Sequence, residues 1–340
     1  MLIRVPDYYD KFHCLAGKCP HSCCTQWEVV IDEEHADQYR CVSGALGEKL
    51  HSALQQDSDG DWCFSLSGGR CPFLDAENLC EIHKELGQAA TSITCQEHPR
   101  FTEDYGTFKE TTLAASCPAA NTLLLESEAP LRFIEFQTDE PTEECDEWIQ
   151  YLLPLRQKML ELLCDRTQPL SLRLQHFLSL AMAAQTCFDE EQPEAILSLL
   201  SQPVPCLMPQ ETSPSPFPAA LLVLTELEPL ESDWHPLVHN AISAASANVS
   251  ASLLERIAVY FAFRYLLKSV NDGDLLGRAQ LVLYAVCVIR RLAGLCGLSE
   301  ALRRFSCEIE HNEENLDALL DALRWQEELS PSALLQAASE

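Results

Sequence analysis

The sequence predicts a mostly α-helical protein with a Cys-rich, metal-centred N-terminal region on a multi-helix C-terminal scaffold. Ten of the 17 cysteines lie before residue 120, in a stretch with frequent turn signals and poor hydrophobic periodicity. From about residue 121, apolar residues recur every three or four positions, as they do on amphipathic helices. No alternating run suggests a sheet of several strands. Apolar residues make up 47% of the 340, which is enough to build a sizeable core.

Changes in composition along the chain predict four segments. Residues 1–125 form the Cys-rich cluster-binding region, 126–200 a helical block, 201–232 a Pro-rich connector and 233–340 a C-terminal helical block. Seven prolines between Ser201 and Leu230 prevent one helix from running through the connector, because each proline removes a backbone donor. Amphipathic spacing predicts helices over residues 148–163, 170–184, 193–200, 251–268, 275–295 and 309–325, and a last short helix after Ser330-Pro331.

Charge and the first residues bear on partners and compartment. A formal net charge of −29 repels phosphate backbones, so we expect no nucleic acid partner. Residues 1–12 carry charges throughout and lack the apolar core of a signal peptide, which predicts a cytoplasmic protein. The most apolar stretch, residues 281–289, is far shorter than the roughly 20 residues of a membrane span. We therefore expect a buried helix there and no membrane partner.

The cysteine pattern indicates a metal centre. Thiols stay reduced in the cytoplasm, so dense cysteines there point to metal or redox chemistry before structural disulfides. Thiolates are soft ligands that favour zinc and iron–sulfur clusters. The sequence offers eight ligand candidates: Cys14, Cys19, Cys23, Cys24, Cys71, Cys80, Cys95 and Cys117.

The remaining cysteines and one histidine have other interpretations. The ligand candidates are single residues plus the Cys23-Cys24 pair, unlike the paired units of zinc fingers, and their spacing departs from C-x3-C-x2-C of radical enzymes. Cys41 and Cys63 are expected to be spectators. His83 is either a ligand or a side chain packed beside the centre. Five later cysteines are expected to act as small buried hydrophobes: Cys164, Cys187, Cys206, Cys287 and Cys296.

Two features of the C-terminal block could serve a site. Glu308 and His311 form a Glu-x-x-His pair, and His311, Asn315 and Leu319 continue one helical face as either a pocket wall or a solvated flank. Residues 256–304 contain eight basic and three acidic side chains. An arginine from this block could pair with an anionic cluster or cofactor, and the alternative is ordinary ion pairs on helix surfaces. The sequence contains neither a glycine-rich nucleotide loop nor a nucleophile elbow.

Motifs at both ends of the chain form a distinctive order. The N-terminal motifs are Phe12-x-Cys14-x4-Cys19-x3-Cys23-Cys24-x2-Trp27, Ile31-Asp32, Cys71-Pro72-Phe73-Leu74-x4-Leu79-Cys80-x-Ile82, Cys95-x3-Pro99-Arg100 and Ser116-Cys117-Pro118. The C-terminal motifs are Tyr260-Phe261-x-Phe263-Arg264-Tyr265 and Glu308-Ile309-Glu310-His311-x3-Asn315-Leu316. This order resembles the flagellin lysine-N-methylase family, whereas residues 130–245 carry only a generic helical pattern.

The resemblance implies an S-adenosylmethionine-dependent methyltransferase that modifies surface lysines of flagellin and holds a 4Fe-4S cluster on its N-terminal cysteines. A neutral lysine amine must attack the sulfonium methyl in line, so the reaction needs a proton acceptor. The candidate proton acceptors are Asp32, Glu110, Tyr265 and His311, and the candidate cofactor-binding residues are Arg100, Arg264 and Asn315. An acidic surface could attract lysine-rich patches of a protein substrate.

A second hypothesis is a non-enzymatic metal-binding protein. In this hypothesis, a zinc or iron–sulfur centre only holds the Cys-rich region on the helical scaffold. The protein then has a structural or metal-handling role. The missing glycine-rich loop leaves the place of any S-adenosylmethionine open.

Overall fold

The computed structural model describes residues 1–340 except 26–28, 58–59, 205, 210–212, 214 and 340. Trp27 of the first motif and Pro205 and Pro214 of the connector lie outside the described residues. The chain divides into two compact units, which we call the helical unit (residues 1–10, 102–116 and 121–340) and the cysteine unit (residues 11–101 and 117–120). This division differs from the expected segments. Residues 1–10, 102–116 and 121–125 of the expected range 1–125 belong to the helical unit. All three later segments also lie within that unit.

The prediction of a mostly helical protein is confirmed. Between residues 118 and 230 the helices are α5 (Pro118–Leu125), α6 (Ile149–Cys164), α7 (Leu170–Asp189), α8 (Pro193–Leu200), α9 (Phe217–Ala220) and the 3-10 turn η4 (Leu221–Thr225). After it come α10 (Trp234–Ser243), α11 (Ala251–Tyr265), η5 (Leu266–Lys268), α12 (Ser269–Asp272), α13 (Leu275–Cys296), α14 (Leu298–Glu310), α15 (Glu313–Trp325), η6 (Glu327–Leu329) and α16 (Pro331–Ser339).

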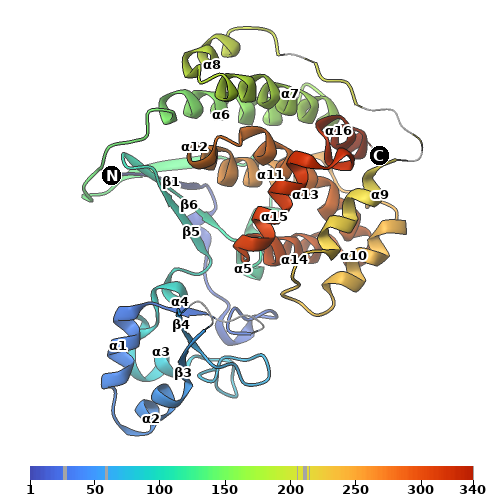
Figure 1. Ribbon diagram of the computed structural model, residues 1–340. Coiled ribbons are helices and arrows are strands. Elements are labelled where there is room, and N and C mark those ends of the chain that lie inside the picture. The colour runs from blue at the N-terminus through green and yellow to red at the C-terminus, as the bar shows by residue number, and fades with distance from the viewer. Residues whose placement is uncertain (26–28, 58–59, 205, 210–212, 214, 340) are drawn as a thin grey trace. The chain divides into compact units, whose positions relative to one another are not determined.

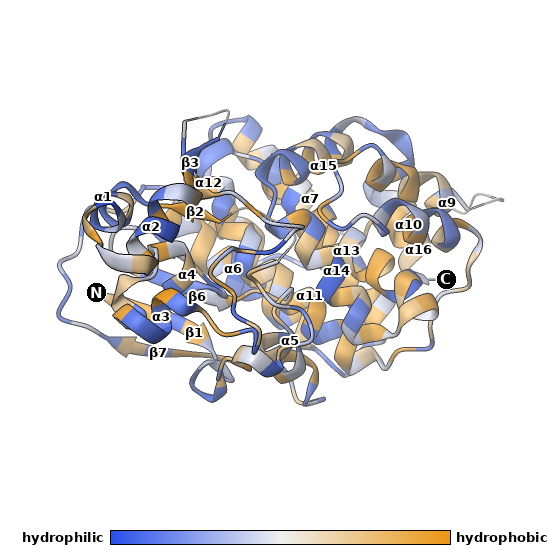
Figure 2. Ribbon diagram, turned by 90° about the horizontal axis from the view of Figure 1, so that it is seen from below, coloured by the Kyte–Doolittle hydropathy of each residue, from blue (hydrophilic) through white to orange (hydrophobic). Residues whose placement is uncertain are grey.

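The core of the helical unit is built around α13. This helix contacts α7, α10, α11, α14, α15 and α16, so it has few solvent-facing positions. Its apolar stretch 281–289 is fully buried, as the sequence predicted. Length and composition alone would let α13 cross a membrane, but 72% of its most apolar window is buried inside the protein. Figure 2 shows hydrophobic residues concentrated on the helices around α13 and α11.

A four-stranded sheet in the helical unit was not expected from the sequence. Its strands are β1 (Leu2–Pro6), β5 (Arg100–Asp104), β6 (Phe108–Leu113) and β7 (Phe133–Gln137), in the order β5-β6-β1-β7. Leu2 pairs with Phe108 in a parallel ladder and with Gln137 in an antiparallel one. The expectation of no multi-stranded sheet was wrong because each strand is short and β1 pairs only with strands that are distant in sequence.

The predicted helix over residues 309–325 is interrupted. Helix α14 ends at Glu310 and α15 begins at Glu313. Asn312 has an extended backbone, and its side chain accepts the Asn315 N–H at 3.0 Å, which caps the new helix. His311 and Asn315 therefore do not continue one helical face, and that part of the prediction was wrong.

The Pro-rich connector contains more structure than expected. Its residues from Phe217 onward form α9 and η4, and Phe217, Leu221 and Leu224 are buried. Helix α10 follows and was not predicted either. Part of the connector is therefore core of the helical unit.

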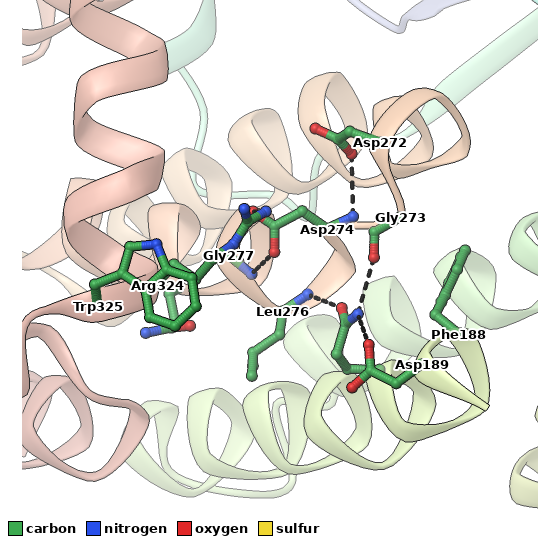
Figure 3. A pocket seen from close by; sticks show the side chains of 11 residues that line it. Phe188, Asp189, Asp272, Gly273, Asp274, Leu276, Gly277, Arg324 and Trp325 are labelled. Carbon is green, nitrogen blue, oxygen red and sulfur yellow. Dashed lines mark hydrogen bonds and ion pairs between the residues drawn. The ribbon is translucent and has the colours of Figure 1, made fainter.

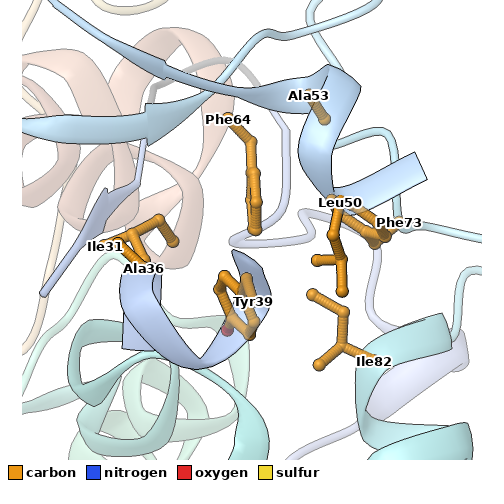
Figure 4. Close-up of a cluster of buried hydrophobic side chains, with 8 residues drawn as sticks. All are labelled: Ile31, Ala36, Tyr39, Leu50, Ala53, Phe64, Phe73 and Ile82. Carbon is orange, nitrogen blue, oxygen red and sulfur yellow. The ribbon is translucent and has the colours of Figure 1, made fainter. Parts of the chain in front are cut away.

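The cysteine unit has short elements around a small core. Its elements are η1 (Tyr9–Lys11, which begins in the helical unit), η2 (Ala16–Lys18), β2 (Val30–Ile31), α1 (Glu33–Cys41), α2 (Gly44–Ala53), β3 (Leu54–Gln56), β4 (Trp62–Phe64), α3 (Glu81–Leu86), η3 (Gln88–Ala90) and α4 (Ile93–Glu97). The strands form a sheet in the order β2-β4-β3. Figure 4 shows the core, in which Tyr39 and Phe64 stack at 5.6 Å and Phe73 lies against Phe64 at 4.6 Å.

Candidate functional site

Backbone pairing in the cysteine unit places several predicted ligands side by side. The Cys71 N–H donates to the Cys24 carbonyl at 2.9 Å, next to a bridge between Thr25 and Arg70. A bridge between Leu74 and Cys80 then folds the following loop back on itself. Cys71 and Cys80 also pack against the small hydrophobic core, so their positions are fixed by it.

A second loop approaches the same region. A Cβ on Gly17 would lie 2.4 Å from the Glu77 carbonyl oxygen, so only glycine allows this contact. Gly17 lies between Cys14 and Cys19, while Glu77 lies three residues before Cys80. This close approach brings the first cysteine motif to the loop that carries the third.

All eight predicted ligands belong to one cysteine set, the eight thiols of the cysteine unit that lie close enough for their charges to interact. Within it, Cys24, Cys71, Cys80 and Cys95 interact with one another in every pairwise combination. Cys14, Cys19 and Cys117 likewise form a complete group of three. Cys23 links both groups, since it interacts with Cys14, Cys24 and Cys95. Residues 117–120 belong to the cysteine unit, which places Cys117 with the other seven.

The thiols influence one another strongly. Burial, followed by Cys24, Cys80 and Cys95, raises the pKa of Cys71 to about 12. The Cys23 thiol donates to Cys24 and lowers the pKa of Cys24 to about 6, while the pKa of Cys23 rises. Most of these shifts favour the neutral thiols, so ionising several of them together would require a cation among them, because like charges oppose ionisation.

The sulfur donors of the cysteine set are of the type that binds a metal ion or an iron–sulfur cluster. All eight sulfurs are free thiols, and the charges of four of them act on one another in every pairwise combination. In the described part of the chain, no three or more His, Cys, Asp or Glu side chains are already arranged around an ion position. The identity of the centre therefore rests on the donors and not on a formed coordination shell.

The other cysteines are mostly where the sequence placed them. Cys41 lies exposed at the end of α1 and is not part of the cysteine set, and Cys63 is buried in β4. Cys187 and Cys287 are buried as expected, whereas Cys206 is exposed, so its prediction as a buried hydrophobe was wrong. His83 is exposed on α3.

Two candidate residues of the cysteine unit have structural partners. Asp32 caps α1: Oδ1 lies 3.1 Å from the His35 N–H and 2.7 Å from His35 Nδ1, while Oδ2 accepts the Ile93 N–H. Burial opposes its ionisation, but these donors outweigh it and lower the pKa of Asp32. Arg100 lies over the Phe12 ring at 5.6 Å. Asp32 is thus engaged in holding α1 and α4 together.

Two further candidates serve the helical unit. Glu110 of β6 is buried and receives both terminal nitrogens of Arg156, at 2.5 and 2.6 Å. The Asn315 side chain donates to the Glu228 and Glu308 carbonyls and accepts the Glu228 N–H, which ties the end of the connector to α14 and α15. Neither residue is available to a substrate in this arrangement.

The candidates Arg264 and Tyr265 meet at Glu310, which the sequence did not single out as a site residue. Glu310 accepts the hydroxyls of Tyr260 and Tyr265 at 3.0 and 3.1 Å, and lies 2.7 Å from Arg264 Nε. Burial and then the Glu310 charge raise the pKa of both tyrosines. We call these four residues the Glu310 network.

The Glu310 network reaches the Ser116-Cys117 motif through two serines. The Ser306 hydroxyl donates to Glu310 and accepts the Ser116 N–H at 2.8 Å. The Ser116 hydroxyl in turn lies 2.6 Å from His311 Nε2. His311 is half-buried, whereas Glu310 and Ser306 are buried, so the histidine is the accessible end of this chain of hydrogen bonds.

An unsatisfied hydroxyl lies near the same network. Tyr8 is buried, and its hydroxyl has no hydrogen-bond partner among the described residues. Its pKa is raised by burial, with Arg256, Asp7 and Glu310 close enough to act on it. Buried polar groups are normally paired, so this hydroxyl is an exception within the helical unit.

The remaining sequence interpretations are resolved by ion pairs and backbone contacts. Glu308 accepts the Leu230 and Glu231 N–H groups at 2.7 and 2.8 Å, so it does not act as a pair with His311. Most of the basic block is paired as ordinary helix residues, for example Arg303 with Glu231 at 2.8 Å and Arg304 with Asp233 at 2.8 Å. Only Arg264 of that block joins the Glu310 network.

Sequence comparisons relate the chain distantly to proteins named lysine-N-methylase. It is 26% identical over 168 residues to the lysine-N-methylase of Salmonella typhimurium, which covers 48% of this chain and 41% of that protein, and matches that of Salmonella choleraesuis to the same extent. It is also 26% identical over 129 residues to the flagellar biosynthetic protein FliU of Salmonella muenchen, over 36% of this chain and 76% of that protein. The chain thus spans about two fifths of the length of the lysine-N-methylases. No family model and no solved structure matches it.

Proposed function

We propose that this protein is a protein-lysine N-methyltransferase that acts on flagellin, uses S-adenosylmethionine and carries an iron–sulfur cluster on the cysteine set. The observation that carries the proposal is its similarity to proteins named lysine-N-methylase, together with a relative named as a flagellar biosynthetic protein. The gathering of eight free thiols in one compact unit supports the cluster.

Cys24, Cys71, Cys80 and Cys95 are the ligands that we assign to the cluster. The charges of these four thiols act on one another in every pairwise combination, and the hydrogen bond from the Cys71 N–H to the Cys24 carbonyl at 2.9 Å supports placing two of them side by side. Cys71 and Cys80 are anchored on the hydrophobic core, which would hold the cluster in one place. When bound, the cluster would supply a redox-capable, anionic iron–sulfur centre.

His311 is the residue that we assign to proton removal. In the reaction, the lysine nitrogen lone pair forms a bond to the methyl carbon, the carbon–sulfur bond breaks, and its electron pair stays on sulfur in S-adenosylhomocysteine. The nitrogen must lose a proton, and imidazole accepts protons near neutral pH. Glu110 and Tyr265 are buried and paired, and Asp32 caps α1, whereas His311 is half-buried with Ser116 as a hydrogen-bond partner.

The test is a methylation assay on purified protein with its iron and sulfide counted. We expect flagellin lysines to gain the mass of one or more methyl groups when S-adenosylmethionine is present. His311→Gln should lower the rate with little loss of folding, while the matched change His83→Gln, at an exposed histidine of α3, should not. A fully folded, cluster-loaded protein that adds no methyl group to flagellin would refute the proposal.

A matched pair of cysteine variants tests the ligands. Cys80→Ser should reduce the iron content and the broad visible absorption of the cluster, and Cys41→Ser, outside the cysteine set, should leave both unchanged. A colourless protein that contains one equivalent of zinc and lacks activity would instead support the non-enzymatic metal-binding alternative.

A further inference from the structure

Strand β7 lies at one end of the four-stranded sheet. It pairs with β1 on one side (Figure 2), and no other strand of the described residues pairs with it on the other side. The Thr138 N–H donates to the Met1 carbonyl at 2.9 Å, so the backbone of Thr138 faces β1. Because hydrogen-bonded pairs alternate along an antiparallel ladder, the backbone N–H and C=O groups of Phe133, Glu135 and Gln137 point to the open side. An added strand could bond to these groups.

The two faces of β7 differ in chemistry. Phe133 stacks on an aromatic ring of α11 with ring centres 3.6 Å apart, which fixes the strand to the helical unit. Side chains alternate between the faces of a strand, so Ile134 and Phe136 point away from that ring, and they are 40% and 43% exposed. Glu135, on the Phe133 face, lies 2.5 Å from Arg4 and is still 52% exposed. The open edge thus has an accessible apolar face and an accessible acidic one.

The segment that follows β7 is strongly acidic. Residues 139–147, which we call the acidic run, contain six acidic and no basic residues, and all six acidic side chains are exposed. The Glu143 N–H donates to the Gly106 carbonyl at 2.9 Å, which holds the run against the turn between β5 and β6. Lys109 lies 2.9 Å from Glu140, and the other five acidic side chains have no ion pair among the described residues. A local negative charge therefore lies at the end of β7.

These features together fit an extended segment with alternating apolar and basic side chains. The backbone of such a segment would bond to the open edge, and its apolar side chains would cover Ile134 and Phe136. Its basic side chains would lie on the other face, near Glu135 and the acidic run. A second copy of this chain fits less well, because two proteins with a net charge of −29 repel each other.

A cavity of about 540 Å³ in the helical unit fits such a segment less well. It lies between the end of α7, the turn from α12 to α13 and the end of α15 (Figure 3). Three carboxylates line it, but Asp274 lies 2.9 Å from Arg324 and Asp272 lies 2.6 Å from Arg278. Arginines thus neutralise two of the three carboxylates. The lining residues come from helices and a turn, so the cavity has no strand to which an extended backbone could be added.

We propose that β7 and the acidic run form a docking edge, which takes up an extended basic segment of the protein substrate as an added strand. That the partner is a substrate rests on the function proposed above. Docking at this edge would hold the substrate through contacts that do not change when the lysine reacts. It should therefore lower KM and leave kcat unchanged.

Binding is measured by fluorescence anisotropy with the full chain and a labelled peptide of five Val-Lys repeats. We expect this peptide to bind, and added salt to weaken binding because it screens the carboxylates. A peptide of five Val-Glu repeats should not bind. The Val-Lys peptide with methylated backbone nitrogens should not bind either, because it cannot donate to the strand edge.

A matched pair of double variants tests the apolar face. Ile134→Ala/Phe136→Ala should weaken binding of the Val-Lys peptide at least about fivefold, as the loss of two cross-strand contacts does. Both side chains are exposed, so circular dichroism should show an unchanged fold. The control Leu197→Ala/Leu295→Ala removes two apolar side chains of α8 and α13 that are 46% and 44% exposed, and it should bind as the wild type does.

A second pair of variants tests the charge. Glu143→Gln/Glu144→Gln should weaken binding and reduce its salt dependence. The control Glu190→Gln/Glu191→Gln removes two exposed charges between α7 and α8 and should do neither. Trp325→Ala, at the cavity, should also bind the peptide as the wild type does.

The outcomes separate this inference from the proposed function. The inference is overturned if the Val-Lys peptide does not bind, if Ile134→Ala/Phe136→Ala binds it unchanged, or if Trp325→Ala alone weakens binding. A dimer of the wild type that Ile134→Ala/Phe136→Ala abolishes would also overturn it. If flagellin is methylated, the same variant should raise KM with kcat unchanged. If the peptide binds at the edge but flagellin gains no methyl group, the docking edge stands and the proposed function fails.

Discussion

The carboxylate of Glu310 is the shared partner of the other three side chains in the Glu310 network, so the stability of the network depends on it. Its side chain is fully buried, and Arg264, which faces it, is 5% exposed. Glu310→Gln would leave the Arg264 cation buried without its counter-charge, so we expect a loss of roughly 3–5 kcal/mol in the free energy of unfolding. Tyr265→Phe removes one hydroxyl and should cost about 1 kcal/mol. Urea unfolding monitored by circular dichroism measures both, and equal losses in the two variants would contradict this view of the network.

Glu308 should make stability depend on pH near neutrality. Burial raises the pKa of this carboxyl to about 7. The backbone N–H groups of Leu230 and Glu231 donate to it and lower its pKa, but burial has the larger effect. In the folded protein the Glu308 carboxyl keeps its proton up to about pH 7. In the unfolded chain, where its pKa is ordinary, the same carboxyl releases the proton at lower pH. The free energy of unfolding should therefore fall as pH rises from about 5 to about 7. Glu231 and Arg304 also act on this group.

The measurement compares unfolding of the wild type and Glu308→Gln across that pH range. The variant, which cannot titrate, should show a smaller decrease than the wild type. Equal slopes in the two proteins would show that other groups cause the decrease.

At the scale of elements, the first turn of α13 depends on a glycine. Asp274 accepts the Gly277 N–H at 3.0 Å and caps the helix, and a Cβ on Gly277 would lie 2.3 Å from the Asp274 carboxylate. Alanine usually stabilises a helix over glycine by about 1 kcal/mol. Here Gly277→Ala should instead destabilise the protein, because displacing the cap costs about 1 kcal/mol or more and adds a clash.

A double-mutant cycle checks this explanation. In a protein that already carries Asp274→Ala, the cap and the clash are both gone, so adding Gly277→Ala should raise the melting temperature. If Gly277→Ala lowers stability equally in both backgrounds, the contact with Asp274 is not the cause.

Which elements could be predicted follows from how local their contacts are. Helices such as α7 and α13 carry their apolar pattern within one segment, so their ranges were close to those observed. The strands could not be found this way, because β1 is defined by partners at residues 108–113 and 133–137. The break at Asn312 was missed because apolar spacing runs across it.

The candidate sites also differ in how far the sequence could predict them. The eight cysteines were singled out because their residue type suggests metal chemistry, and the fold brings all of them into one unit, while their role as ligands stays a prediction. The structural partners of Asp32, Glu110 and Asn315 could not be predicted, because a polar side chain has the same appearance in sequence whether it caps a helix, pairs with an arginine or binds a substrate. The cavity lined by Gln185, Gly273 and Trp325 gave no sequence signal, since its walls come from four separate helices.

At the scale of the whole molecule, the two units should respond differently to loss of the proposed metal centre. The cysteine unit has a small core of eight buried residues, so we expect the metal centre to contribute much of its stability. Chelation should therefore make residues 11–101 sensitive to limited proteolysis, while residues 121–340 keep their helical circular dichroism signal. Mass spectrometry of the fragments locates the cuts.

Cys80→Ser should reproduce the effect of the chelator, and Cys41→Ser should not. A single cooperative transition that unfolds both units together when the metal is removed would contradict independent stabilisation of the cysteine unit.

The central position of β1 also determines the order in which a nascent chain can fold. The ribosome makes β1 first, yet the strands that flank it end at Leu113 and Gln137. At about 5–20 residues per second, β1 remains without partners for on the order of ten seconds. During that interval residues 11–101 emerge completely, so the proposed cluster ligands are available before the sheet can close. The apolar side chains of Ile3 and Val5 are accessible to chaperones meanwhile. Under the proposed iron–sulfur assignment, a lack of iron during synthesis would leave the cysteine unit without its cluster while β1 is still unpaired.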